Sequence, residues 1–446
     1  MNGSRRSSRR RFLKRAAALA AGGVAAPYVI PADVLAAHGR AGANDRIGIG
    51  WIGTGRRSHQ MIGDLKRTPS LPGQCRVVAV ADVWPKKCHD YLKSYEEKVL
   101  VPKGGKAGAK YAVHQDYRRL LESADVDAVV LTTPEHSRAL PCVLACQAGK
   151  DVYPEKPLCL TIREGRAMVE AVRKYKRVCQ VGTQQRSMFR NREASELLRN
   201  GRIGKIHTVI CQNWGGSQPY SDFKLPTEPI PEGMDWDHWC GQTEPVPFSM
   251  NVYLTYNKPG WHNIRRYSGG WMANAGSHSL DIVQWGLGTD DTGPVEVTPE
   301  RKGHNAKVTF RYADGVLLKL EGHKDASAFG AVFVGDKGTL VEHRGRFNTI
   351  PIALSKEPLG EGAIRLYKSD LHFQNWIDCI KSRKDPAANV ESGHRVCTIC
   401  HLSNIARALG RKLNWDPAKE TFPGDDEANT FLSRSQRKGY QLPDTV

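Results

Sequence analysis

Two sets of residues in this chain have the types that oxidation of an alcohol requires. Lys156 follows Glu155 directly after a short apolar stretch, and His278 lies four residues past Asn274. A fixed lysine ammonium at the end of a strand stabilises the charge that develops on an alkoxide. A histidine with an ordinary pKa can accept the proton of the hydroxyl group. Lys156 and His278 are therefore the candidate catalytic pair for a secondary alcohol.

The segment around His278 predicts two supporting residues. At the start of a helix, residues 274 and 278 lie on one face, as do residues 278 and 281. Asn274 and Asp281 are therefore expected to orient the catalytic pair, and Asp281 could fix the tautomer of His278. A structural role is the alternative for each set, because most Glu-Lys pairs form surface turns and most single histidines are packing residues.

A nucleotide site is indicated near the start of the chain. The apolar run 47–52 is typical of a buried parallel strand, and it ends in Gly53-Thr54-Gly55. Glycines at such positions permit a tight turn and let a pyrophosphate approach a helix N-terminus. Ser58 takes the third position of this fingerprint, where a small residue lets helix and strand pack closely.

An acidic residue after the second apolar run indicates which dinucleotide binds. The separation between Gly55 and Asp82 in the sequence is somewhat longer than the roughly 20 residues that are typical of this fold. An acid there accepts the ribose hydroxyls and repels a 2′-phosphate, which favours NAD over NADP. Arg56 and Arg57 could hold a 2′-phosphate instead.

The order of the expected elements predicts the fold class. Helix-like and strand-like segments alternate up to residue 182, which predicts an α/β Rossmann domain with a parallel sheet over residues 44–182. Beyond it, strand-like runs follow one another with short turns between them. Residues 183–446 are expected to form an α+β domain with an open, mainly antiparallel sheet.

Three local motifs resemble those of the Gfo/Idh/MocA family of oxidoreductases. They are Thr132-Thr133-Pro134-Glu135-His136, the Glu155-Lys156-Pro157 signature after Gly149-Lys150-Asp151-Val152, and the Gly-rich segment that contains His278. The resemblance implies a sugar, polyol or glycoside as substrate, and a second sheet that covers the active site and makes a homo-oligomer. It also implies that NAD contacts residues from all of the first-domain motifs, namely Gly53, Thr54, Gly55, Arg56, Arg57, Asp82, Thr133, Pro134, His136, Glu155 and Lys156.

Asn274 departs from the resemblance, because much of the family has aspartate at this position. Asparagine can bind a sugar hydroxyl but cannot supply a negative charge or take a proton. Two alternatives to a dehydrogenase therefore stay open. One is a glycosidase that uses bound NAD in a closed redox cycle, and the other is a non-catalytic protein that retains NAD.

The first 43 residues predict a twin-arginine signal peptide. Arg9, Arg10 and Arg11 precede Phe12-Leu13-Lys14, and a modestly apolar stretch follows. This export machinery carries folded proteins, which suits an enzyme that loads its cofactor in the cytoplasm. We expect a periplasmic or otherwise exported protein.

Composition excludes several other classes of protein. The formal net charge is +19, of which about +12 remains without the signal, but the charge is scattered and no nucleic-acid-binding motif is present. The eleven cysteines lie far apart, and Cys397-x-x-Cys400-His401 lacks a second pair at zinc-ribbon spacing, so no metal site is expected. The long connection 215–267 carries Trp236, Trp239 and Trp261, which could bind sugar rings or serve as packing anchors.

Overall fold

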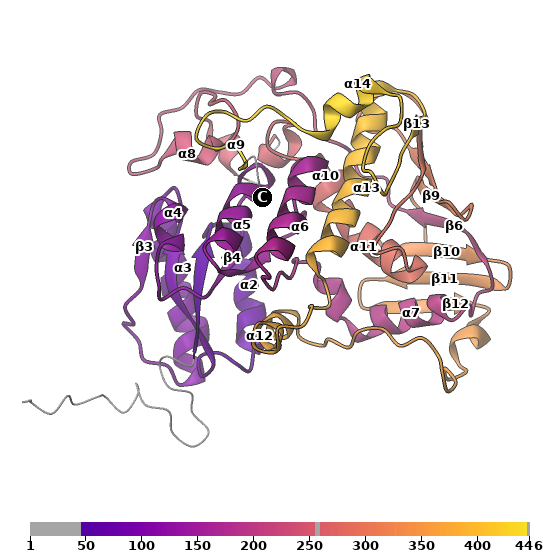
Figure 1. Cartoon of the computed structure of the whole chain (residues 1–446), viewed down its shortest axis with the longest axis horizontal. Helices are drawn as coiled ribbons and strands as arrows, with labels where there is room; N and C mark the ends of the chain where they lie inside the picture. Colours follow the sequence, from indigo (N-terminus) through magenta and orange to yellow (C-terminus); the bar gives the residue numbers. More distant parts are fainter. Residues whose placement is uncertain (1–45, 255–258, 326, 444–446) are drawn as a thin grey trace, which may run out of the picture. The chain divides into compact units, whose positions relative to one another are not determined.

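The computed structural model describes residues 46–254, 259–325 and 327–443. The predicted signal peptide, residues 1–43, lies outside these described residues. From Ile47 onward the chain forms one unit that contains two β-sheets, each packed against helices (Figure 1). No helix within the described part combines the length and the apolar character that crossing a bilayer requires.

The first sheet has five strands in the order β3-β2-β1-β4-β5, and every neighbouring pair is parallel. The prediction of a Rossmann-like parallel sheet is therefore confirmed. The strands are β1 (Ile47–Ile52), β2 (Cys75–Ala81), β3 (Ala112–His114), β4 (Ala128–Leu131) and β5 (Asp151–Pro154). The helices between and after them are α2 (Arg56–Arg67), α3 (Pro85–Tyr95), α4 (Tyr117–Leu121), α5 (Ala139–Gln147) and α6 (Ile162–Lys174).

The central strands are apolar because helices cover both faces of the sheet. Every residue of β1 and of β4 is buried. On one face Trp51 packs against Tyr91 of α3, with ring centroids 5.1 Å apart. Phe373 and Trp376 belong to the same apolar cluster, although they come from α12 (His372–Ser382), far along the chain. The first core is therefore completed by a helix from the C-terminal part.

The second sheet has eight strands in the order β12-β11-β10-β6-β9-β8-β7-β13. All neighbouring pairs are antiparallel except β6 and β9, which are parallel. The expected open, mainly antiparallel sheet is thus confirmed. The strands are β6 (Ile206–Cys211), β7 (Glu296–Pro299), β8 (Val308–Arg311), β9 (Leu317–Leu320), β10 (Ala331–Gly335), β11 (Gly338–His343), β12 (Arg346–Ile350) and β13 (Leu413–Asn414).

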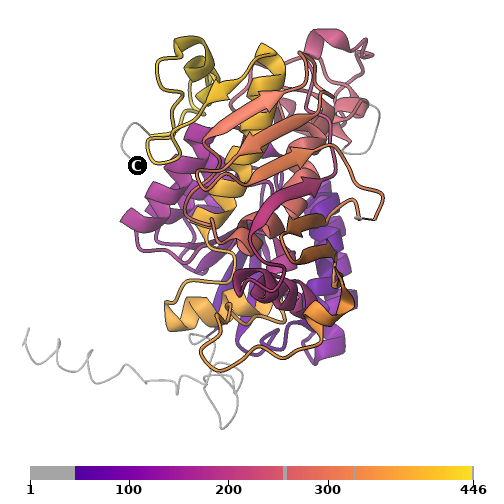
Figure 2. The same cartoon turned by 90° about the vertical axis from the view of Figure 1, so that its right-hand side faces the viewer.

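Helices cover one face of the second sheet and leave the other face without a helical layer (Figure 2). The covering helices are α7 (Phe189–Arg199), α11 (Gly276–Leu287) and α13 (Val390–Leu409), whose buried residues form one apolar cluster with those of the strands. Alternate residues along the strands point into this cluster, as the period of a strand requires. The short helix α14 (Asp426–Asn429) lies near the C-terminal end of the chain.

The connection between β6 and α11 has a small apolar cluster of its own. The connection contains the short helices α8 (Trp236–Cys240), α9 (Met250–Tyr253) and α10 (Gly270–Asn274). Trp236 and Trp239 stack with centroids 4.4 Å apart and are both buried. Both therefore serve as packing anchors, one of the two roles that the sequence left open for these tryptophans. Trp239 and Trp261 also line the cavity described below, so sugar binding stays a prediction for these two.

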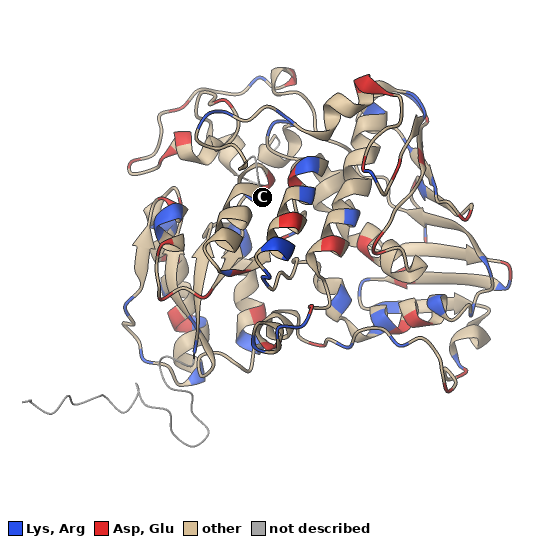
Figure 3. Cartoon of the chain, in the orientation of Figure 1, with Lys and Arg blue, Asp and Glu red and all other residues tan. Residues whose placement is uncertain are grey.

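Lys and Arg residues are distributed over the helices, strands and loops of both halves, with Asp and Glu residues among them (Figure 3). Many of them form ion pairs at the surface, such as Arg411 with Asp425 and Glu427. The positive charge of the described residues is therefore dispersed over the molecule, as the sequence predicted.

Candidate active site

A cavity of about 780 Å³ lies at the carboxyl ends of the Rossmann strands. In a parallel sheet this edge is where ligands bind, because the strand ends and the helix N-termini meet there. Every residue predicted to bind the cofactor lines this cavity, and so do Lys156, Asn274 and His278. Asp281 does not line it. The local motifs therefore meet in space, although they lie more than 200 residues apart in the sequence.

The turn after β1 leaves open space for a ligand. Gly53 has φ of +83°, and a Cβ there would lie 3.0 Å from the backbone nitrogen of Thr133, so glycine is required at this position. A Cβ at Gly55 would meet no heavy atom within 4 Å, and Gly55 has no side chain to cap α2. The first N–H groups of α2 therefore face a cradle suited to a pyrophosphate. Ser58 is buried, and its hydroxyl donates to the carbonyl of Gly55 at 2.5 Å.

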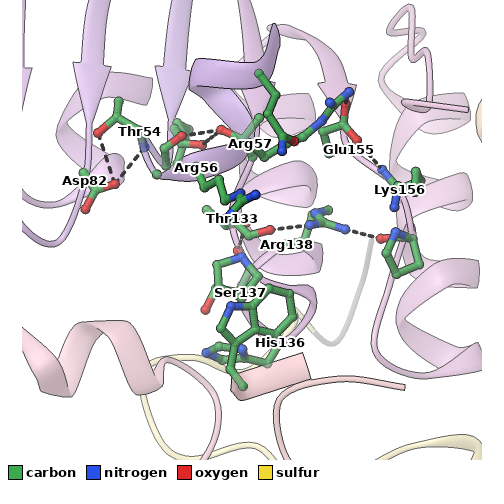
Figure 4. A pocket seen from close by; sticks show the side chains of 18 of the residues that line it. Thr54, Arg56, Arg57, Asp82, Thr133, His136, Ser137, Arg138, Glu155 and Lys156 are labelled. Carbon is green, nitrogen blue, oxygen red and sulfur yellow. Dashed lines mark hydrogen bonds and ion pairs between the residues drawn. The ribbon is translucent and has the colours of Figure 1, made fainter. Parts of the chain in front are cut away.

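Asp82 is held at the end of β2 by three donated hydrogen bonds. The backbone N–H of Thr54 donates to Oδ2 at 2.7 Å, and the Thr54 hydroxyl donates to the same oxygen at 3.1 Å (Figure 4). The N–H of Trp84 donates to Oδ1 at 3.0 Å. These bonds use both lone pairs of Oδ2 and leave one on Oδ1. The carboxylate can therefore accept a ribose hydroxyl through Oδ1 while it fixes the glycine turn.

A chain of polar contacts leads from α2 to Lys156 (Figure 4). Arg57 Nη2 lies 2.7 Å from Glu155 Oε1, and the N–H of Lys156 donates to Glu155 Oε2 at 3.2 Å. Gln184 donates to the same Glu155 Oε1 at 3.1 Å. Glu155 is buried and paired, so its carboxylate orders the backbone that carries Lys156.

Lys156 points at Asn274. Its Nζ donates to the Asn274 backbone carbonyl at 2.7 Å and to Asn274 Oδ1 at 2.9 Å. Burial, with Arg57 and Arg138 nearby, lowers the pKa of Lys156 to about 8, although Glu155 and Glu135 oppose the shift. Both acceptors are neutral, so neither supplies the negative charge that an aspartate at position 274 would.

His278 faces the cavity as a neutral imidazole. Burial lowers its pKa well below the usual value, and the positive charges of Lys156, Arg344 and Arg57 lower it further. Its ring meets the edge of Phe329 with centroids 5.4 Å apart, and its Nδ1 has no hydrogen-bond partner among the described residues. A neutral imidazole that lines the cavity can accept a proton from a substrate.

The expected role of Asp281 is wrong in this structure. Asp281 Oδ1 lies 2.8 Å from Nε of Arg186, whose two Nη atoms bind Asp290. This buried guanidinium, and not His278, is the partner of Asp281, because it supplies a full charge and a directed donor. In addition, Ala275 separates α10 from α11, so residues 274 and 278 do not share one continuous helix.

Two buried charged residues that were not predicted organise the loop after β4. Glu135 accepts hydrogen bonds from the Ser268 hydroxyl and from the Gly269 N–H, each at 2.7 Å, and burial raises its pKa to about 7. Arg138 donates to the backbone carbonyls of Thr133 and Pro157. Together they connect this loop to the segments that carry Lys156 and Asn274.

His136 lies at the boundary between the cavity and the aromatic connection. Its Nε2 is 2.8 Å from the backbone oxygen of Trp239, and its ring contacts Trp239 and Tyr267. Burial lowers its pKa to about 4, so the ring is neutral at ordinary pH. His136 thus lines the cavity while it anchors the aromatic cluster.

Several further residues form the cavity wall. Trp261, which the sequence indicated as a possible sugar-binding residue, lines the cavity together with Tyr253 of the same connection and Tyr440 of the C-terminal segment. From the second domain come Met188, Phe329 and Arg344, the last in the turn between β11 and β12. The C-terminal segment therefore contributes to the site.

Comparison with known families agrees with this geometry. Residues 47–183 match the family description "Oxidoreductase family, NAD-binding Rossmann fold". Residues 202–442 match "Oxidoreductase family, C-terminal alpha/beta domain" of the same group, which is more than half of the chain. The chain belongs to the Gfo/Idh/MocA oxidoreductase family. The resemblance expected from the sequence is thereby confirmed.

Individual Gfo/Idh/MocA relatives are distant. Inositol 2-dehydrogenase of Salmonella typhimurium is 26% identical over 197 residues, which cover 43% of this chain and 52% of that protein. The chain spans about half the length of the first curated relatives it matches.

Two solved structures show the same fold. The aldose-aldose oxidoreductase of Caulobacter crescentus, complexed with glycerol, aligns with a TM-score of 0.55 at 19% identity, over 83% of this chain and 99% of that one. The WlbA dehydrogenase of Bordetella pertussis, in complex with NADH and UDP-GlcNAcA, gives 0.55 at 17% identity with the same coverage.

The described residues fit a bound dinucleotide in three respects. The uncapped α2 N-terminus and the open space at Gly55 suit the pyrophosphate, and Asp82 presents an acceptor for a ribose. Arg56 and Arg57 lie on the first turn of α2 and line the same cavity.

Proposed function

We propose that this chain is an NAD-dependent oxidoreductase that transfers a hydride between the nicotinamide and a secondary alcohol of a sugar, polyol or glycoside. The observation that carries the proposal is the meeting of Lys156 and His278 in the same cavity as the Gly53–Gly55 turn. The inositol dehydrogenase and aldose oxidoreductase relatives act, by their names, on substrates of this class.

In this proposal Lys156 binds the substrate hydroxyl and stabilises its oxygen as negative charge develops. His278 accepts the hydroxyl proton, since its lowered pKa keeps the ring neutral and available. Asn274 fixes the direction of Lys156 through two acceptors. The chemistry that NAD supplies when bound is acceptance of the hydride from the carbinol carbon.

We propose NAD in preference to NADP because Asp82 occupies the end of β2. Its carboxylate is hydrogen-bonded to Thr54 and Trp84 and cannot turn away from a ribose without breaking those bonds. A 2′-phosphate would meet this fixed negative charge, although Arg56 and Arg57 on α2 offer positive charge nearby.

The proposal is tested by purifying the protein natively, denaturing it and identifying any released nucleotide by mass spectrometry. A panel of sugars and polyols is then assayed for NADH absorbance. Sugar-dependent NADH formation with free exchange of NAD supports the dehydrogenase. Substrate conversion with no net NADH indicates a closed redox cycle, as in an NAD-dependent glycosidase. Bound NAD with no turnover, restored by Asn274→Asp, indicates a binding protein, and no nucleotide affinity refutes the central claim.

We also propose export through the twin-arginine machinery to the periplasm or beyond. The support is the sequence Arg9-Arg10-Arg11-Phe12-Leu13-Lys14 ahead of an apolar stretch. Replacing the three arginines by lysine in the full chain should retain the protein in the cytoplasm, whereas the unchanged chain should be exported. Equal export of both versions would refute this route.

A homo-oligomer is the last part of the proposal. In the described part of the chain, one face of the second sheet has no helical layer, and a sheet face of this kind can pair with a second copy (Figure 2). Light scattering coupled to gel filtration gives the mass in solution, and a monomer at all concentrations would contradict this part alone.

A further inference from the structure

Three potential metal ligands converge on the side of the Lys156 loop that faces α13. Cys159 follows that loop, and Cys397 and His401 lie one turn apart on α13. The Sγ atoms of Cys159 and Cys397 are 3.5 Å apart, and Cys397 Sγ lies 3.4 Å from His401 Nε2. All three ligand atoms lie within 4.8 Å of one another.

A fourth donor faces the same space. The backbone oxygen of Cys159 is 3.1 Å from His401 Nε2 and 3.3 Å from Cys397 Sγ. The side chains are almost fully enclosed, with exposures of 0% for Cys159, 1% for Cys397 and 5% for His401. Two sulfurs, one imidazole nitrogen and one carbonyl oxygen therefore surround one buried point.

The separations resemble those around a tetrahedral zinc ion. Zn–S distances of about 2.3 Å and Zn–N distances of about 2.0–2.1 Å place two sulfur ligands about 3.8 Å apart, and a sulfur and a nitrogen ligand about 3.5 Å apart. The observed 3.5 Å and 3.4 Å are slightly shorter. For these two pairs, an ion would need the ligands to move outward by only a few tenths of an ångström.

The donor set favours a zinc ion. Cysteine sulfur and histidine nitrogen are the ligands that zinc takes in structural sites, and a tetrahedral ion needs four donors.

We propose that Cys159, Cys397 and His401, with the Cys159 carbonyl oxygen, bind one Zn²⁺ ion. Both cysteines bind the ion as thiolates and His401 binds it as a neutral imidazole. Two thiolates then balance the double positive charge, so the buried site stays neutral. A monovalent soft cation such as Cu⁺ would leave a net negative charge buried, which is costly.

The site is structural, because its ligands come from distant segments and none of them lines the active-site cavity. It connects the chain just past Lys156 to α13. His401 also lies against the Ser268–Gly270 segment, because a Cβ at Gly269 would be 3.4 Å from His401 Cε1. The ion would thereby hold together two segments that position Lys156 and Asn274.

Cys400 is the matched control. It lies on the same helix, is fully buried and belongs to the Cys-x-x-Cys-His stretch, yet it is not among the three converging ligands. A site formed by the sequence motif alone would require Cys400, whereas the proposed site requires Cys159 in its place.

The first experiment measures metal content by mass spectrometry on full-length protein purified natively without chelators. Wild type and Cys400→Ser should each carry about one zinc ion per chain, and Cys159→Ser and Cys397→Ser at least about tenfold less. Copper in place of zinc, or a loss of zinc in Cys400→Ser equal to that in Cys397→Ser, would overturn the assignment.

The second experiment does not depend on whether the variants fold. Wild-type protein is stripped with a chelator, kept reduced and titrated with Co²⁺. Thiolate-to-cobalt charge-transfer absorption with tetrahedral ligand-field bands is expected, and Zn²⁺ should abolish both. Native protein with neither zinc nor cobalt uptake, or with a Cys159–Cys397 disulfide by peptide mapping, would refute the site. Either result would leave the proposed oxidoreductase activity intact.

Discussion

Asn274→Asp is the substitution that tests the proposed catalytic site most directly. It exchanges an amide for a carboxylate of the same size, at an oxygen that lies 2.9 Å from Lys156 Nζ. The side chain has room in its present position, so the main change is one negative charge. The pKa of Lys156, lowered to about 8 in the wild type, should rise.

The size of the shift follows from the distance. Two unit charges 2.9 Å apart attract by about 6 kcal/mol at an effective dielectric constant of about 20. Desolvation of the new carboxylate offsets part of this energy, and an opposite charge at such a distance shifts a pKa by about 1–3 units. That range corresponds to about 1.4–4 kcal/mol.

The assay is the pH dependence of kcat/KM for alcohol oxidation, with the substrate that the sugar panel identifies. Lys156 must carry its proton to stabilise the alkoxide, while His278 is already neutral. Wild-type activity should therefore fall as pH rises through about 8, and in Asn274→Asp this descending limb should move up by about 1–3 units.

Asn274→Ala is the control, because it removes Oδ1 and keeps the backbone carbonyl that also accepts from Lys156. Its descending limb should stay within about half a unit of the wild type, since no charge is added. A limb that does not move in Asn274→Asp, or that moves equally in both variants, would refute the assignment of that limb to Lys156.

Three further predictions concern other residues. Lys156→Ala should lower kcat/KM by about 10²–10³, as the loss of one oxyanion donor does. Lys150 lies outside the cavity, so Lys150→Ala should leave kcat/KM unchanged. Equal effects of the two substitutions would show that Lys156 has no catalytic role. Asp82→Ser should shift the ratio of kcat/KM for NADP and NAD towards NADP by about tenfold or more, and an unchanged ratio would contradict its ribose contact. Glu135 keeps its proton up to about pH 7 in the folded state, whereas the unfolded chain loses it near the ordinary pKa of glutamate. The free energy of unfolding should therefore fall as pH rises between these two values. Glu135→Gln should reduce the slope of the free energy of unfolding against pH by up to about 1.4 kcal/mol per pH unit. Chemical denaturation at several pH values measures this difference, and parallel slopes would exclude Glu135 as its source.

Local patterns predicted the parts of the site that a short stretch of chain determines. The apolar run before Gly53 and Gly55 indicates a strand, a turn and a helix start whatever the rest of the chain does. Lys156 and His278 belong to similarly local motifs, and the structure brings both to one cavity. The order of helix-like and strand-like segments likewise predicted both sheets, because the pattern of apolar residues in each segment follows from its burial.

Contacts between distant segments could not be predicted in this way. Asp281 was assigned to His278 by helical spacing, but its partner Arg186 lies 95 residues away in sequence. Cys159 approaches Cys397 across 238 residues, with no pattern that links them. A single sequence carries periodicity and spacing, whereas such pairs depend on how the two cores pack.

The aromatic connection between β6 and α11 has a consequence for the evolution of this protein. Its apolar cluster, which includes Trp236, Trp239 and Tyr267, is separate from the clusters of the two sheets. Trp239 and Tyr253 nevertheless line the cavity. Substitutions or length changes there can alter the cavity wall at little cost to either main core. Such an insertion can diversify under selection for new substrates while the nucleotide turn and Lys156 are inherited unchanged.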